Sequence, residues 1–188
     1  METYYELEPD IFGKYVPKIT SDLGEGIRFK SGSLIQGQVP SPIVFATNHS
    51  AADPPKGMHG RIVPVMSDEL IGALQQAGVS NLQCFAAELR SNIDGTVWNN
   101  YQAVNVIGLI ACADLDRSEY TGIIDRPGEW SLPLMAFEDL KIDPARSRDA
   151  LLFRLAEDPT VIIVAGGVVE SLLAQKSDDA WGITLDET

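Results

Sequence analysis

Two apolar, β-rich stretches joined by an Asp-Gly turn constrain the fold of this chain more than any other feature. The stretches span residues 82–90 and 97–113, and the tetrapeptide Asn-Ile-Asp-Gly at 92–95 lies between them. An Asp-Gly pair between two such runs is a strong hairpin signal, because glycine readily adopts the positive φ that a tight hairpin turn needs. The sequence therefore predicts an antiparallel strand pair near the middle of the chain.

A short strand at 62–65 and a helix at 68–77 are predicted just before this hairpin. Ser67 can accept a hydrogen bond from a free N–H group at the start of the helix, and Gly78 is placed to end it. Asp68 and Glu69 lie in the first turn, where the helix dipole favours acidic side chains. The apolar residues that share one face of this helix are Leu70, Ile71, Leu74 and Ala77.

The C-terminal part of the chain shows a similar alternation of apolar patterns. We expect a strand at 132–142, a hairpin formed by 150–155 and 161–164, a second helix at 168–175 and an edge strand at 181–185. The order strand, small residue, helix, strand at 62–85 recurs at 162–185. A single recurrence indicates one supersecondary arrangement used twice rather than a true duplication.

Residues 1 to about 60 are rich in glycine and proline, so this part is predicted to be loop-rich. Within it we expect short strands at 27–29, 33–35 and 42–47, and an acidic arm at 1–10. A chain of 188 residues with 45% hydrophobic residues suits a single domain, 1–188, with its core in 61–188. The predicted fold class is α+β: a mostly antiparallel sheet with two main helices packed on it.

Charge and hydropathy exclude several classes of function. Lys and Arg number 14 against 27 Asp and Glu, and a net charge of −13 repels the phosphate backbone of nucleic acids. The longest apolar runs, 103–113 and 161–169, fall short of the roughly 20 residues that a bilayer span needs. The first ten residues contain no Lys or Arg, unlike a signal peptide. We therefore expect a cytoplasmic protein that binds neither nucleic acid nor membrane.

Patterns typical of catalysis or cofactor binding are weak in this sequence. His49, Asp53 and His59 could hold a metal in principle, but their spacing matches no metal motif, so polar loop residues are the favoured interpretation. Gly166 and Gly167 follow an apolar strand and open a helix, where N–H groups can bind an anion. No Lys, Ser or Thr completes a phosphate site there, so a tight structural turn is favoured.

The two cysteines, Cys84 and Cys112, lie on stretches predicted to pair and could face each other. Neither has a His or Lys nearby in the sequence that would lower the pKa of its thiol. Two cysteines are too few for a disulfide scaffold, so reduced thiols that pack as small hydrophobic groups are the favoured interpretation.

Several short motifs, taken in order, are similar to those of one known family. They are Val63-Pro64-Val65-Met66-Ser67, the helix at 68–77 with Leu70 and Leu74, Tyr101-Gln102-Ala103-Val104-Asn105-Val106, Asp114 followed by Ser118, Leu152-Phe153-Arg154-Leu155, and Ile162-Ile163-Val164 before an amphipathic helix. Together, from about 61 to 185, they resemble the Imm11 immunity-protein family, also called the DUF1629 domain. Where that family often begins its second helix with Ser and Asp, this chain has Ala165 and Gly166.

The resemblance implies a bacterial protein, encoded beside a polymorphic toxin, that binds this toxin and blocks it. It implies no catalytic residues, and we expect a protein that is not an enzyme and that holds no cofactor or metal. A net charge of −13 suits a basic partner such as a nuclease toxin, because complementary fields speed association.

The candidate partner-binding surface combines acidic side chains with aromatic anchors after the apolar stretch that ends at 113. It consists of Asp114, Asp116, Glu119, Tyr120, Asp125, Glu129 and Trp130. A turn that ends the strand is the structural alternative for 114–120. The acidic arm at 2–10, with Tyr4 and Tyr5, is an alternative surface. Two other functions stay open: a small-ligand-binding or signalling module, favoured by a deep apolar pocket, and a hydrolase that uses His49, Asp53 and His59.

Overall fold

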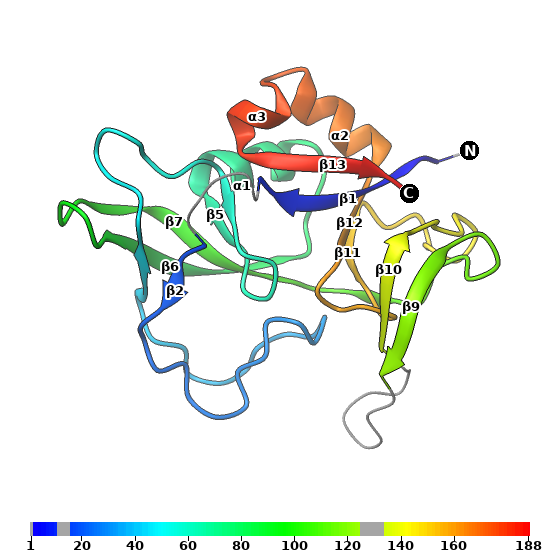
Figure 1. Ribbon diagram of the computed structural model, residues 1–188, viewed down its shortest axis with the longest axis horizontal. Coiled ribbons are helices and arrows are strands. Elements are labelled where there is room, and N and C mark those ends of the chain that lie inside the picture. The colour runs from blue at the N-terminus through cyan, green and yellow to red at the C-terminus, as the bar shows by residue number, and fades with distance from the viewer. Residues whose placement is uncertain (1, 11–15, 125–133) are drawn as a thin grey trace.

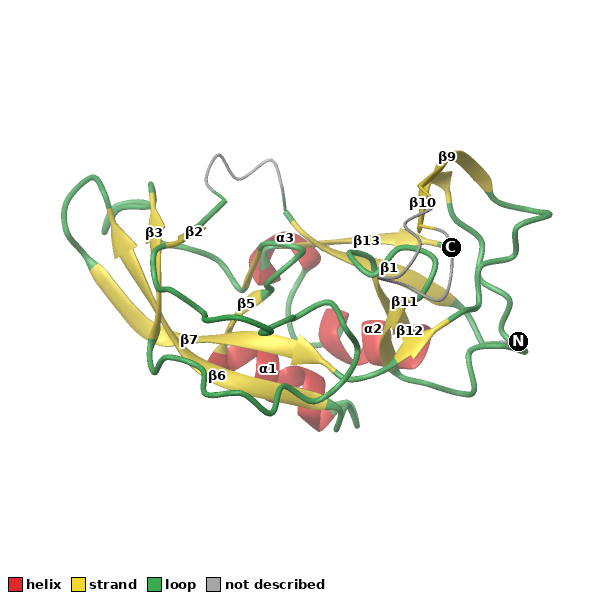
Figure 2. Ribbon diagram, turned by 90° about the horizontal axis from the view of Figure 1, so that it is seen from below, coloured by secondary structure: helices red, strands yellow, loops and turns green. Residues whose placement is uncertain are grey.

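Two main β-sheets and a separate hairpin make up the fold in the computed structural model, which describes residues 2–10, 16–124 and 134–188 (Figures 1 and 2). The five-stranded sheet has the order β13 (Ile183–Glu187), β1 (Tyr4–Pro9), β12 (Ile162–Ala165), β11 (Leu152–Leu155) and β8 (Leu109–Ile110). The six-stranded sheet has the order β2 (Lys18–Ile19), β3 (Ile43–Thr47), β6 (Leu82–Ser91), β7 (Val97–Val106), β5 (Val65–Ser67) and β4 (Met58–His59). The hairpin pairs β9 (Glu119–Ile124) with β10 (Leu134–Asp139).

The same arrangement of strand, helix and strand occurs once in each main sheet. In the six-stranded sheet, β5 leads through helix α1 (Asp68–Gln76) to β6, and β7 lies antiparallel between these two strands. In the five-stranded sheet, β12 leads through α2 (Gly166–Leu173) and α3 (Asp178–Trp181) to β13, and β1 lies antiparallel between them. Each is a split β-α-β unit, so the recurrence seen in the sequence reflects one supersecondary arrangement used twice.

Helix α1 forms where its local signals place it. The Ser67 side chain accepts a hydrogen bond from the Leu70 N–H at 3.2 Å, and Gly78 follows the helix with a φ of +96°. Leu70 and Leu74 are fully buried. Because α1 contacts α2, these leucines join a core that both main sheets share. The predicted hairpins 82–90/97–113 and 150–155/161–164 are also present, as β6–β7 and β11–β12.

The predicted α+β class is wrong, because the structure is mostly β, with 39% strand and 12% helix, and the three helices found in the described residues are short. The sheets are also mixed: β3 runs parallel to β6, and β11 runs parallel to β8. The apolar stretch 97–113 explains part of the error. It breaks at Gly108, which has a φ of +118°, so β7 belongs to one sheet and β8 to the other.

The N-terminal segment differs most from its prediction. The expected arm is β1, a strand paired on both sides, and it buries Tyr4 and Leu7. The acidic residues of this segment suggested an arm on the surface. The strands that pair with it, β12 and β13, lie at the far end of the chain and could not be recognised from the local sequence. Residues 27–29 and 33–35 form no strand, whereas β3 confirms the one predicted at 42–47. Among the helices of the described residues, none is long and apolar enough to cross a membrane.

Candidate partner-binding surface

Four of the seven residues predicted to bind a partner lie together at the β9–β10 hairpin. Glu119 and Tyr120 begin β9, while Asp114 and Asp116 lie in the turn that leads into it. The hairpin is a two-stranded sheet of its own and stands at one end of the molecule, beyond the five-stranded sheet (Figures 1 and 2). Asp125, Glu129 and Trp130 lie outside the described residues.

The turn at 114–118 fixes the base of this hairpin. The Asp114 carbonyl accepts hydrogen bonds from the N–H groups of Arg117, at 3.2 Å, and Ser118, at 2.9 Å. Ser118 Oγ in turn accepts a hydrogen bond from the Lys141 N–H at 2.9 Å, just after β10. The structural interpretation of 114–118 as a turn is therefore confirmed, and the same turn places the acidic residues on the surface.

The register of the hairpin adds acidic residues that the sequence patterns missed. Glu119 lies opposite Asp139, and Glu138 precedes Asp139 on β10. Two of the carboxylates have cation partners: Asp139 lies 2.6 Å from Lys141 Nζ, and Asp114 lies 3.8 Å from Arg117. The others are Asp116, Glu119 and Glu138, which are exposed and have no ion pair within the described part of the chain.

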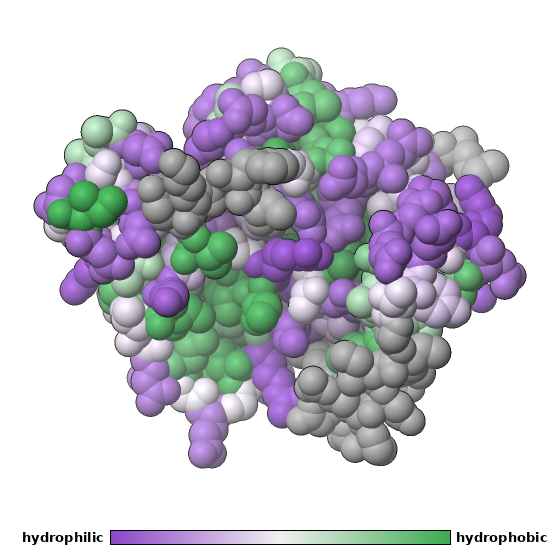
Figure 3. Space-filling view, in the orientation of Figure 1, coloured by the Kyte–Doolittle hydropathy of each residue, from purple (hydrophilic) through white to green (hydrophobic). Residues whose placement is uncertain are grey.

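An aromatic pair, in which Tyr120 is exposed and Phe137 is partly buried, lies beside these carboxylates. The rings of Tyr120 and Phe137 meet edge to face, with centroids 5.9 Å apart, and Tyr120 is 37% exposed. Aromatic side chains on a polar rim are frequent anchors of protein interfaces, because they bury much apolar area at little cost in side-chain entropy. Figure 3 shows hydrophilic side chains gathered at the upper right, on the same end of the molecule.

The alternative acidic surface at 2–10 does not form as predicted. Tyr4 is buried, and Glu6 and Glu8 lie 2.9 Å and 2.8 Å from the Arg61 guanidinium. Because β1 is enclosed between β12 and β13, this segment belongs to the interior of a sheet rather than to an arm.

The two histidines are brought together, but not in the arrangement that a metal site needs. Their ring centroids are 5.3 Å apart, and His49 Nδ1 lies 3.1 Å from the backbone oxygen of Asp53 rather than from its carboxylate. Burial and the nearby His49 lower the pKa of His59 to about 4, so this ring is neutral at pH 7. The described residues contain no group of three or more side chains that could hold a metal ion.

The other motifs have structural roles. The Gly166 N–H, at the start of α2, donates a hydrogen bond to the Thr3 carbonyl at 2.8 Å, so this N–H group is not available to an anion. This confirms the tight-turn interpretation.

The two cysteines are free thiols that do not face each other. Cys84, on β6, lies opposite Val104 on β7 and packs against the core that the two main sheets share, whereas Cys112 is buried in a separate apolar cluster. Burial raises the pKa of both, that of Cys112 to about 12.

Comparison with known proteins gives no relative that would name this site: no family model and no curated protein matches the chain.

Proposed function

We propose that the protein is a bacterial immunity protein, which binds a cognate toxin in the cytoplasm and neutralises it by forming a stoichiometric complex. In this proposal the chain is not an enzyme and needs no cofactor, and its partner is the toxin protein rather than nucleic acid or membrane. The proposal builds on the motifs that resemble the Imm11 family.

The observation that supports it best is the β9–β10 hairpin. Asp116, Glu119 and Glu138 give it exposed negative charge that no ion pair within the described residues neutralises, and the Tyr120–Phe137 pair gives it an apolar centre. A basic nuclease toxin would be attracted over a distance by this charge and by the net charge of −13. Contact with the aromatic pair would then slow dissociation, because such anchors contribute much of the binding energy of an interface.

The first experiment is co-expression with the product of the gene immediately upstream, scored for survival of the host and for a complex in a pull-down. We expect rescue together with a stable complex. A neighbouring product that is toxic yet neither bound nor neutralised would overturn the immunity proposal.

A charge-reversal pair then tests the surface. The double variant Asp116→Lys/Glu119→Lys should slow association with the toxin roughly tenfold at low ionic strength and weaken its dependence on salt, because electrostatic steering is lost. The control, Glu25→Lys/Glu170→Lys, makes the same change in net charge at two exposed positions away from the hairpin. Equal effects of the two variants would show that total charge, and not this hairpin, guides binding.

A further inference from the structure

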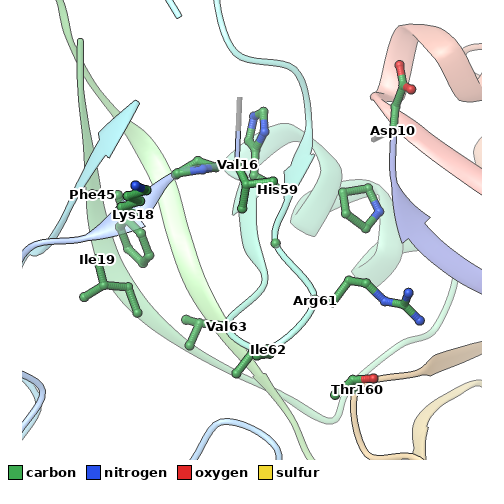
Figure 4. Close-up of a pocket in the computed structure, with 13 residues that line it drawn as sticks. Asp10, Val16, Lys18, Ile19, Phe45, His59, Arg61, Ile62, Val63 and Thr160 are labelled. Atoms are coloured by element: carbon green, nitrogen blue, oxygen red, sulfur yellow. The ribbon is translucent and has the colours of Figure 1, made fainter. Parts of the chain in front are cut away.

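An open groove of about 680 Å³ lies between the two main sheets (Figure 4), and no residue of β9 or β10 lines it. Its walls come from β2 and the residues just before it, from Phe45 on β3, from His59 on β4 and the loop at 60–63, from Pro9 at the end of β1, and from Thr160 in the turn between β11 and β12. This volume lies in the range of pockets that hold small organic ligands.

The lining of the groove is largely apolar, and several of its side chains are exposed. Val16 is 68% exposed, Ile62 57% and Ile19 37%, and all three line the groove. Figure 4 shows Ile19 and Phe45 on one side, with Ile62 and Val63 across from them. Apolar side chains gathered around a cavity in this way indicate a site for an apolar ligand or for the apolar part of an amphiphile.

The charges along the groove decide which kind of amphiphile fits. Arg61 is held by the carboxylates of Glu6 and Glu8, and Asp10 lies 3.5 Å from Lys56 Nζ. His59 is buried and neutral at pH 7 because its pKa is lowered to about 4. Lys18 is exposed, and within the described part of the chain it has no carboxylate partner.

We propose that this groove binds an amphiphilic monoanion such as a long-chain carboxylate, with its head group at Lys18 and its chain along Val16, Ile19 and Ile62. The positive charge of Lys18 attracts the head group, and burial of the chain removes apolar surface of both partners from water. This site is separate from the toxin-binding surface and does not depend on the immunity proposal.

Isothermal titration of the full chain with dodecanoate tests the charge preference, with dodecyltrimethylammonium as the cationic counterpart and both kept below their micelle concentrations. We expect saturable 1:1 binding of dodecanoate and an affinity at least about tenfold higher than for the cation. Absence of saturable binding, or equal affinity for the two amphiphiles, would overturn the proposal.

Two matched pairs of exposed variants locate the site. Lys18→Glu should weaken dodecanoate binding at least about fivefold, while Arg28→Glu, an equal charge change outside the groove, should change it less than about twofold. Ile62→Glu should weaken it at least about tenfold, while Ile93→Glu, at the tip of the β6–β7 hairpin, should not. Circular dichroism confirms that each variant is folded, and equal losses within either pair would place the ligand elsewhere.

Discussion

At the scale of single residues, Glu6 is the carboxyl group that the fold perturbs in the most informative way. Burial, a hydrogen bond with Glu8 and the negative charges of Glu8 and Asp186 together raise its pKa to about 7, against the opposing effect of Arg61. Glu6 lies on β1, while Arg61 belongs to the loop before β5. Its protonation state therefore affects a contact that joins the two main sheets.

This raised pKa predicts how stability depends on pH. An unfolded glutamate has a pKa of about 4.3, so between this value and about 7 the folded state holds a proton that the unfolded state has lost. The stabilising contribution is present below about pH 4 and is lost as the pH rises through about 7. Glu6→Gln, which cannot titrate, should flatten the pH dependence of the free energy of unfolding between pH 5 and 8 by about 1–2 kcal/mol.

Urea denaturation at several pH values measures this effect. Glu187→Gln, at an exposed position on the neighbouring strand β13, is the control and should keep the wild-type slope. Parallel stability curves for wild type and Glu6→Gln across the window would contradict the assignment to Glu6.

At the scale of elements, two glycines should respond in opposite ways to the same substitution. Gly108 joins β7 to β8 with a φ of +118°, which L-residues rarely adopt, and its N–H donates to the Gly32 carbonyl at 2.8 Å. Gly72 lies inside helix α1, and a Cβ added there would meet nothing within 4 Å. Gly108→Ala should lower the free energy of unfolding by roughly 1–3 kcal/mol, and Gly72→Ala should raise it by about 0.5–1 kcal/mol.

Thermal and urea unfolding of the two alanine variants check this pair. A Gly108→Ala variant as stable as wild type would mean that the backbone conformation of the β7–β8 connection does not limit this substitution, and a Gly72→Ala variant less stable than wild type would contradict the expectation for the helix.

The elements that could be predicted are those whose signals are local. Helix α1 carries its own cap and apolar face, and the β6–β7 hairpin has its turn between its two strands. Strand β1 could not be found in this way, because Tyr5 pairs with Val164 and Glu187, both more than 150 residues away. Acidic side chains in β1 also lowered its apparent strand propensity.

The candidate partner-binding surface could likewise be predicted only where its residues are neighbours in the sequence. The acidic residues at 114–119 are adjacent in the sequence and could be selected together. Glu138 and Asp139 could not, because they join this surface only through the pairing of β10 with β9, whose register shifts twice. Local pattern contains no information about such a shift.

At the scale of the whole molecule, the two ends of the chain hold the fold together. β1 lies between β12 and β13, and the Thr188 N–H donates to the Tyr4 carbonyl at 3.0 Å. Leu7 on β1 packs in the core cluster that also contains Leu70 and Leu74 of α1. The five-stranded and six-stranded sheets thus share one apolar core, and we expect them to unfold together.

Leu7→Ala tests this expectation, because it removes a fully buried side chain where the two sheets meet. It should lower the free energy of unfolding by about 2–5 kcal/mol, whereas Leu34→Ala, at a side chain that is 61% exposed, should change it by less than about 0.5 kcal/mol. Far-ultraviolet circular dichroism and tryptophan fluorescence should report one coincident transition in Leu7→Ala, as in wild type. Two separated transitions would mean that each split β-α-β unit is stable without the other, and that the shared core adds stability without making the two sheets cooperative.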